Sequence, residues 1–169
     1  MNSEKLCDEC HAGRQRVMLQ GKGFVRGIEA AQSVHSAITC VGCHMNEANH
    51  GMKLFRPDNP ELPEDRLDTC TLCHKDNNRK ERARQLTDWQ SLYNEALKPV
   101  ETDMAAIEAR LKEKPGQLNA DMEVKLRTLR LNLMFLRRDG SRGAHNLDYA
   151  RAILAQAAKD INEIKEAIK

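Results

Sequence analysis

All six cysteines of this 169-residue chain belong to three copies of one short unit, Cys-x-x-Cys-His. The three units are Cys7-Cys10-His11, Cys40-Cys43-His44 and Cys70-Cys73-His74. Two cysteines at this spacing can add their thiols to the two vinyl groups of one porphyrin, and the histidine that follows can bind the iron. The pattern therefore predicts three covalently bound haems c.

Two other interpretations use the same cysteine spacing. Zinc sites combine two Cys-x-x-Cys pairs in one tetrahedral centre, so three pairs leave one pair over, and zinc does not explain the histidine after each second cysteine. A disulfide framework suits shorter secreted chains, and a disulfide within Cys-x-x-Cys is strained and redox-active. The haem interpretation accounts for all three units and is favoured over both.

Three histidines lie outside these units, one for each predicted haem, at His35, His50 and His145. A six-coordinate haem iron needs a distal ligand opposite its proximal histidine, so the numbers predict two histidine ligands for every iron. Methionine is the alternative distal ligand, and Met18, Met45 and Met52 lie near the units. Two imidazoles hold the haem potential lower than a thioether does, which suits anaerobic respiratory electron flow.

Composition excludes several classes. The chain has 27 Lys plus Arg and 25 Asp plus Glu, a net charge of +2. This balance argues against a dedicated nucleic-acid binder. No stretch approaches the roughly 18 apolar residues of a membrane-spanning helix, so we expect no transmembrane segment. Aromatic residues make up only 4% of the chain, and three porphyrins would supply the large apolar groups that the core otherwise lacks.

The chain divides into two regions, and the predicted fold class is mainly α. Residues 1–77 form a loop-rich trihaem-binding region, and residues 78–169 form a bundle of three long helices that supplies His145 as a distal ligand. Apolar residues at spacings of three and four predict the first helix from about Asn78 to Lys112, with a kink at Pro99. Asn119 and Asn146 are the predicted N-caps of the other two helices.

The apolar faces of these helices need partners. The helices can pack on one another and on the haem region, or they can mediate a homodimer or docking on another subunit. Basic residues at Arg79, Lys80, Arg82 and Arg84 follow the last unit. They form either a solvated helix face or a surface for haem propionates or an acidic redox partner.

A set of these residues resembles a known family. His35, the Cys40-Cys43-His44-Met45 element and the sequence Arg142-Gly143-Ala144-His145-Asn146 at the start of a helix carry the resemblance. In this order, over roughly residues 27–165, the chain is similar to the C-terminal half of pentahaem cytochrome c nitrite reductase and its multihaem relatives, hydroxylamine oxidoreductase and the octahaem reductases. In that family the long helices also contribute to a dimer interface.

The resemblance implies which histidines share an iron. It pairs His35 with His74, His145 with His44 and His50 with His11. His50 lies closer to its preceding unit than the family pattern has it. Asn46 and Leu147 also stand where the family tends to have proline.

The departure from the family at its catalytic haem predicts the function. That haem carries lysine in a Cys-x-x-Cys-Lys unit, and this chain contains no such unit. We therefore expect an electron carrier that works with redox partner proteins, and no catalytic residues. The alternative is a reductase of a small nitrogen or sulfur oxyanion, which requires His35, His50 or His145 not to bind iron, so that one haem stays open.

The predicted cofactor also predicts the location. Covalent haem attachment takes place outside the cytoplasm, so we expect a periplasmic or other extracytoplasmic protein. Residues 1–6 contain no apolar signal region, so we expect either that a signal peptide has been removed or that the chain is a mature or excised form.

Overall fold

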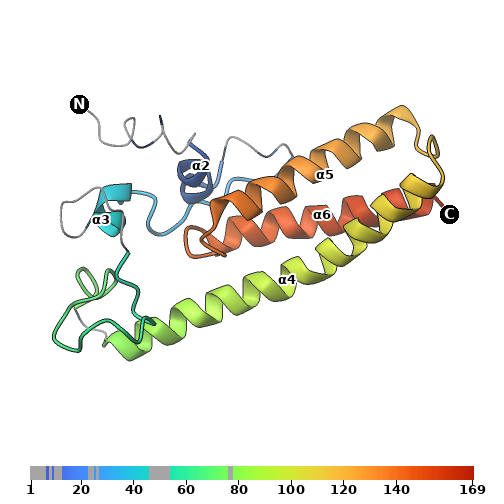
Figure 1. Cartoon of the computed structure of the whole chain (residues 1–169). Coiled ribbons are helices and arrows are strands. Elements are labelled where there is room, and N and C mark those ends of the chain that lie inside the picture. The colour runs from blue at the N-terminus through green and yellow to red at the C-terminus, as the bar shows by residue number, and fades with distance from the viewer. Residues whose placement is uncertain are drawn as a thin grey trace.

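The computed structural model describes Cys7, Glu9 and residues 13–22, 25, 27–45, 54–75 and 78–169. Among the described residues, the short helices α2 (Arg14–Gln20) and α3 (Cys40–His44) precede three long ones (Figure 1). The long helices are α4 (Arg79–Glu113), α5 (Ala120–Asp139) and α6 (Leu147–Ala167). The described residues include no strand. The predicted mainly-α fold, with a loop-rich first part and three long helices, is confirmed.

Each long helix begins after an asparagine whose side chain accepts a backbone hydrogen bond three residues ahead. Asn78 accepts from the N–H of Glu81 at 2.9 Å, Asn119 from Met122 at 2.9 Å and Asn146 from Tyr149 at 3.1 Å. These bonds satisfy donors that the first turn of a helix leaves unpaired. The predicted N-caps at Asn119 and Asn146 are therefore confirmed, and Pro99 lies within α4 without ending it.

The hydrophobic core forms where α6 packs between α4 and α5. The buried residues follow the apolar periodicity of the sequence, with Ile107 on α4, Leu129 on α5 and Ile161 on α6 all nearly inaccessible to solvent. Helix α2 packs on α5, and its Met18 belongs to the same core. The three long helices thus pack on one another and on part of the first region. Within the described residues, no helix is long and apolar enough to cross a membrane.

The segment before His35 lies against the end of α2. The N–H of Ala31 donates to the carbonyl of Gly21 at 3.1 Å, and the N–H of Ser33 donates to Leu19 at 3.2 Å. Gly21 has a φ of 63°, and a Cβ there would lie 1.9 Å from the Ala31 carbonyl oxygen, so only glycine fits. The side-chain amide of Asn146 donates to that same carbonyl. Asn146 therefore connects the beginning of α6 to the segment that carries His35.

Arg79 has a structural role that neither interpretation of the basic cluster foresaw. Its guanidinium donates to backbone carbonyls of the loop that precedes the third unit. The acceptors are Pro57 at 3.1 Å, Asn59 at 2.6 Å, Leu62 at 2.8 Å and Pro63 at 3.1 Å. The fixed fork of donors on arginine suits this arrangement, because one side chain satisfies several carbonyls that form no ladder. The first turn of α4 thereby fixes the conformation of that loop.

The two bonds of the Asn146 side chain lead to a prediction about stability. The substitution Asn146→Ala should lower the free energy of unfolding by about 2–4 kcal/mol, because it removes a helix cap and leaves the partly buried Ala31 carbonyl without its side-chain donor. The measurement is urea unfolding of the haem-loaded protein followed by circular dichroism.

Asn119→Ala is the matched control, because Asn119 caps α5 from an exposed position. It should cost only about 1 kcal/mol, the usual value for a lost cap. Equal losses for the two variants would contradict a role for the bond between Asn146 and Ala31.

Candidate haem-binding site

The second Cys-x-x-Cys-His unit is a short helix in itself. Helix α3 spans Cys40–His44, and the N–H of Met45 closes it by donating to Val41 at 3.1 Å. One helical turn separates Cys40 from Cys43, which places both thiols on one side of the helix. His44 is the last residue of the helix and is half-buried.

A buried carboxylate shapes the third unit. Asp68 is fully buried and accepts hydrogen bonds from the N–H of Cys70 at 2.8 Å, the N–H of Thr71 at 3.1 Å and the Thr71 hydroxyl at 2.6 Å. The N–H of His74 donates to Cys70 at 2.9 Å, which closes one helical turn. Asp68 thus acts as a cap for the turn that positions both cysteines and the histidine. The sequence analysis missed this residue, although an aspartate two residues before a helical turn is a recognisable capping signal.

The second and third units are in direct contact. The Thr69 hydroxyl donates to the Cys43 carbonyl at 3.3 Å. Burial, together with the nearby Asp68 and Cys43, raises the pKa of the Cys70 thiol to about 11. Burial and the nearby Cys73 likewise raise the pKa of Cys43. Cys43 and Cys70 therefore lie in one partly buried region, and Cys73 is exposed beside them.

The structure brings the rings of His35 and His74 close together. Their ring centres lie 6.0 Å apart, with an angle of 83° between the ring planes. Burial lowers the pKa of His35, and the nearby positive charges of His74 and Arg82 lower it further. The lowered pKa favours the neutral imidazole, which is the form that binds metals.

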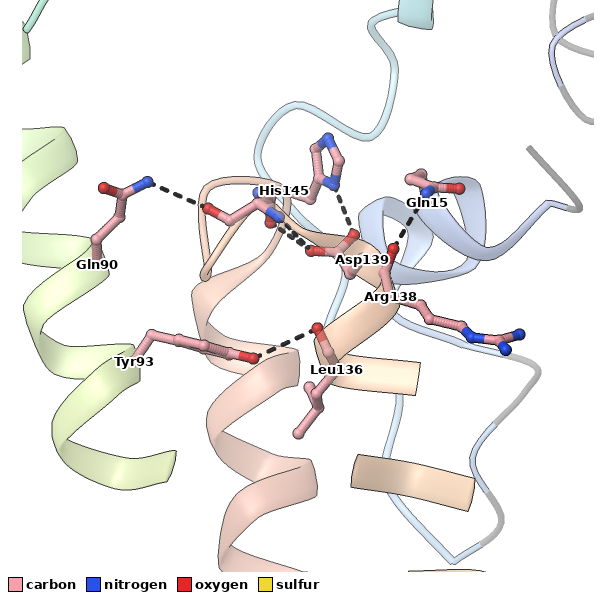
Figure 2. Close-up of polar contacts among 8 residues, drawn as sticks. Gln15, Gln90, Tyr93, Leu136, Arg138, Asp139 and His145 are labelled. Carbon is pink, nitrogen blue, oxygen red and sulfur yellow. Dashed lines mark hydrogen bonds and ion pairs between the residues drawn. The ribbon is translucent and has the colours of Figure 1, made fainter. Parts of the chain in front are cut away.

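The structure also brings together His44 and His145, which are a hundred residues apart in the sequence. Their ring centres lie 6.3 Å apart, with an angle of 58° between the planes. His145 follows the turn between α5 and α6, where its Nδ1 lies 2.7 Å from a carboxylate oxygen of Asp139 (Figure 2). This leaves the other ring nitrogen of His145 available on the side away from Asp139.

Both separations fit an iron held between two imidazoles. Imidazole nitrogens bind first-row metals at about 2.0–2.1 Å, and the ring centre lies roughly 1.1 Å beyond the nitrogen, so two rings on opposite sides of one metal have centres about 6.3 Å apart. Separations of 6.0 Å and 6.3 Å agree with this distance. The residues present thus fit two six-coordinate haems, one on each of the second and third units.

The remaining predicted residues are divided between the described and undescribed parts of the chain. Cys10, His11, His50 and Met52 lie outside the described residues, so the ligands of the first unit stay a prediction. Cys7 is described and half-buried.

The two described methionines that were alternative ligands have other surroundings. Met18 is 1% exposed and belongs to the hydrophobic core, and Met45 follows the last residue of α3.

A comparison with protein families accounts for this arrangement. Residues 28–168 match the cytochrome c552 family. The chain belongs to this family. The cytochrome c552 match covers the second and third units, all three long helices and both histidine pairs. It confirms the resemblance to multihaem cytochromes, and membership implies covalently bound haem c.

A solved structure shows the same fold. The chain is similar to the crystal structure of the outer cell wall cytochrome OcwA, with a TM-score of 0.68 and 23% sequence identity. The similarity covers 95% of this chain and 35% of that one, so the chain spans about a third of the length of the cytochrome it matches. No curated protein matches the sequence.

The histidine pairs lead to a prediction about spin state. If His44 and His145 hold one iron, the substitution His145→Ala should convert that haem from low spin to high spin, because the iron would lose its second imidazole. His35→Ala should do the same to the haem of the third unit. The measurement is electron paramagnetic resonance of the oxidised protein.

Met18→Leu is the control, since it keeps the volume of a buried side chain and removes the thioether. It should leave all haems low spin. A high-spin signal in the methionine variant but not in the histidine variant would show that the distal ligand is methionine.

Proposed function

We propose that this chain is an electron carrier that holds three haems c, each with two histidine ligands. The observation that supports the proposal is the separation of the two histidine pairs, 6.0 Å and 6.3 Å, which fits ligation of an iron from both sides. Cys7, Cys10, Cys40, Cys43, Cys70 and Cys73 would attach the porphyrins. His11, His44 and His74 would be the proximal ligands, and His50, His145 and His35 the distal ones.

The chain performs this function by holding ligands in place. When bound, each haem supplies an iron that changes by one electron between the ferric and ferrous states. The His44 imidazole comes from the end of α3 and the His145 imidazole from the turn just before the N-cap of α6, and Asp139 fixes the orientation of the His145 ring. Contact between Thr69 and Cys43 keeps the second and third units adjacent, which suits transfer of an electron from one to the other.

The alternative is a reductase with one open haem. It requires one of the three distal histidines not to bind iron. The two histidine pairs of the second and third units favour the carrier at those sites, because each iron would have both axial positions taken. An open site would therefore be expected at the first unit, whose ligands lie outside the described residues.

We also propose where and with what the chain works. Covalent haem attachment supports a periplasmic or other extracytoplasmic location, and electron transfer requires redox partner proteins. The long helices support a homodimer as well. A groove between α4 and α6 is lined by small side chains such as Ala96, Ala152 and Ala155, with Asp103 and Arg151 beside them. A surface with both signs of charge can pair with a second copy of itself across a two-fold axis.

The dimer proposal is tested by replacing a small residue of the groove. Ala155 is exposed on α6, and Ala155→Glu would place a charged side chain where the second copy packs. Sedimentation equilibrium should show a dimer for the unsubstituted protein and a weaker dimer for the variant. A monomer at all concentrations without the substitution would overturn the dimer and leave the carrier proposal intact.

The carrier proposal is tested by ligand binding to the reduced protein. The mass of the purified chain should exceed that of the polypeptide by three haems. Its visible spectrum should show sharp α and β bands on reduction and should not change when carbon monoxide or nitrite is added, because no axial position is open.

A high-spin signal that responds to nitrite would overturn the carrier in favour of the reductase. The variant His50→Ala is the positive control for the carbon monoxide assay. It should create one site that binds carbon monoxide.

A further inference from the structure

Asp139 is a buried carboxylate in the middle of the proposed electron-transfer site. It is the last residue of α5, and its side chain is 3% exposed. One of its carboxylate oxygens contacts His145, and the other accepts from the backbone N–H of Ser141 at 3.2 Å and from the Ser141 hydroxyl. Burying a carboxylate is costly unless it is hydrogen-bonded. Its contacts are directed at the turn that carries a proposed iron ligand.

The contact between Asp139 and His145 sets which nitrogen of the ring can bind a metal. Nδ1 of His145 lies 2.7 Å from the carboxylate. Because a carboxylate can only accept a hydrogen bond, Nδ1 carries the ring proton and donates a hydrogen bond to Asp139. The other nitrogen, Nε2, then has its lone pair free on the opposite side of the ring. The centre of the His44 ring is 6.3 Å away. A carboxylate that accepts from a ligating histidine both orients the ring and makes it a stronger donor to the metal.

Three hydrogen bonds from α4 and α2 hold the turn around Asp139. Gln90 on α4 donates to the Ser141 carbonyl, the Tyr93 hydroxyl donates to the Leu136 carbonyl, and Gln15 on α2 donates to the Arg138 carbonyl, each at 3.4 Å (Figure 2). The N–H of His145 also donates to the Ser141 hydroxyl at 3.1 Å. With these contacts around it, the carboxylate keeps a fixed position relative to the histidine.

The charge of Asp139 acts on its surroundings. Burial raises the pKa of Tyr93 to about 12, and the negative charge of Asp139 contributes to this increase. At the other described site the buried Asp68 is accompanied by Arg82, whose positive charge acts on both His35 and Cys70. The two sites thus differ in the charge that their surroundings place near the proposed iron.

We propose that Asp139 is a positioning residue that orients His145 and lowers the reduction potential of the haem held by His44 and His145. This rests on the proposed function. A negative charge hydrogen-bonded to the distal imidazole stabilises the ferric state, which carries one more positive charge than the ferrous state. The haem of the second unit would then pass electrons readily to the haem of the third unit.

The experiment is a spectroelectrochemical titration of the haem-loaded protein with the substitution Asp139→Asn. Asparagine has the same shape and can still accept from Nδ1, but it removes the charge. One of the three midpoint potentials should move upward, the other two should stay in place, and all haems should remain low spin. Asp139→Glu restores the charge and should return the midpoint toward its original value.

Asp160→Asn is the matched control. Asp160 is also a buried aspartate, with 6% of the whole residue exposed against 7% of the whole residue for Asp139. It lies on α6 and pairs with Lys125 and Gln156. Its variant should lose stability without moving any midpoint. Unchanged midpoints in Asp139→Asn, or an equal shift in Asp160→Asn, would overturn the proposal.

Ser141→Ala is a second test, in which the midpoint potential should shift in the opposite direction. It keeps the proposal falsifiable if Asp139→Asn does not fold. Without the Ser141 hydroxyl, the carboxylate has one donor fewer and accepts more strongly from His145. The same midpoint should therefore move downward, and an upward shift would contradict the proposal. A high-spin spectrum of the unsubstituted protein would instead overturn the proposed function itself.

Discussion

Two pairs of histidines lie at the separation that a shared iron requires, and much of the fold serves to produce that separation. The partners come from distant parts of the sequence, His35 with His74 and His44 with His145. Short local structures position the proximal partners, since each lies at the end of one helical turn within its Cys-x-x-Cys-His unit. The distal partners depend on tertiary structure, because the end of α2, the turn after α5 and the start of α6 must all be in place.

The sequence predicted what short-range rules determine. The N-caps Asn119 and Asn146 follow from the side-chain chemistry of asparagine, and the buried faces of the long helices follow from the spacing of apolar residues. The haem attachment units could be predicted from the positions of the cysteines alone. The histidine partners came from the resemblance to a family, because the residues alone give three spare histidines without assigning any of them to an iron.

The features that the sequence analysis missed depend on contacts at long range or on burial. Arg79 stood in a run of basic residues, and only the folded loop shows that its guanidinium satisfies backbone carbonyls. Asp139 stood beside two arginines at the end of a helix, where an exposed aspartate would have been unremarkable. Its burial against His145 depends on the turn between α5 and α6, which no periodic pattern of the sequence determines.

The double role of Asn146 has a consequence for how the protein is made. Its side chain caps α6 and also holds the carbonyl of Ala31, close to His35. Residue 146 lies far beyond the three cysteine units in the sequence, so a chain exported from its N-terminal end would deliver it to the compartment of haem attachment after them. On the proposed ligation, haem attached early would wait with an incomplete ligand set until the last helix arrives. Both described sites would then be completed together and late, when Asn146 caps α6 and binds the Ala31 carbonyl.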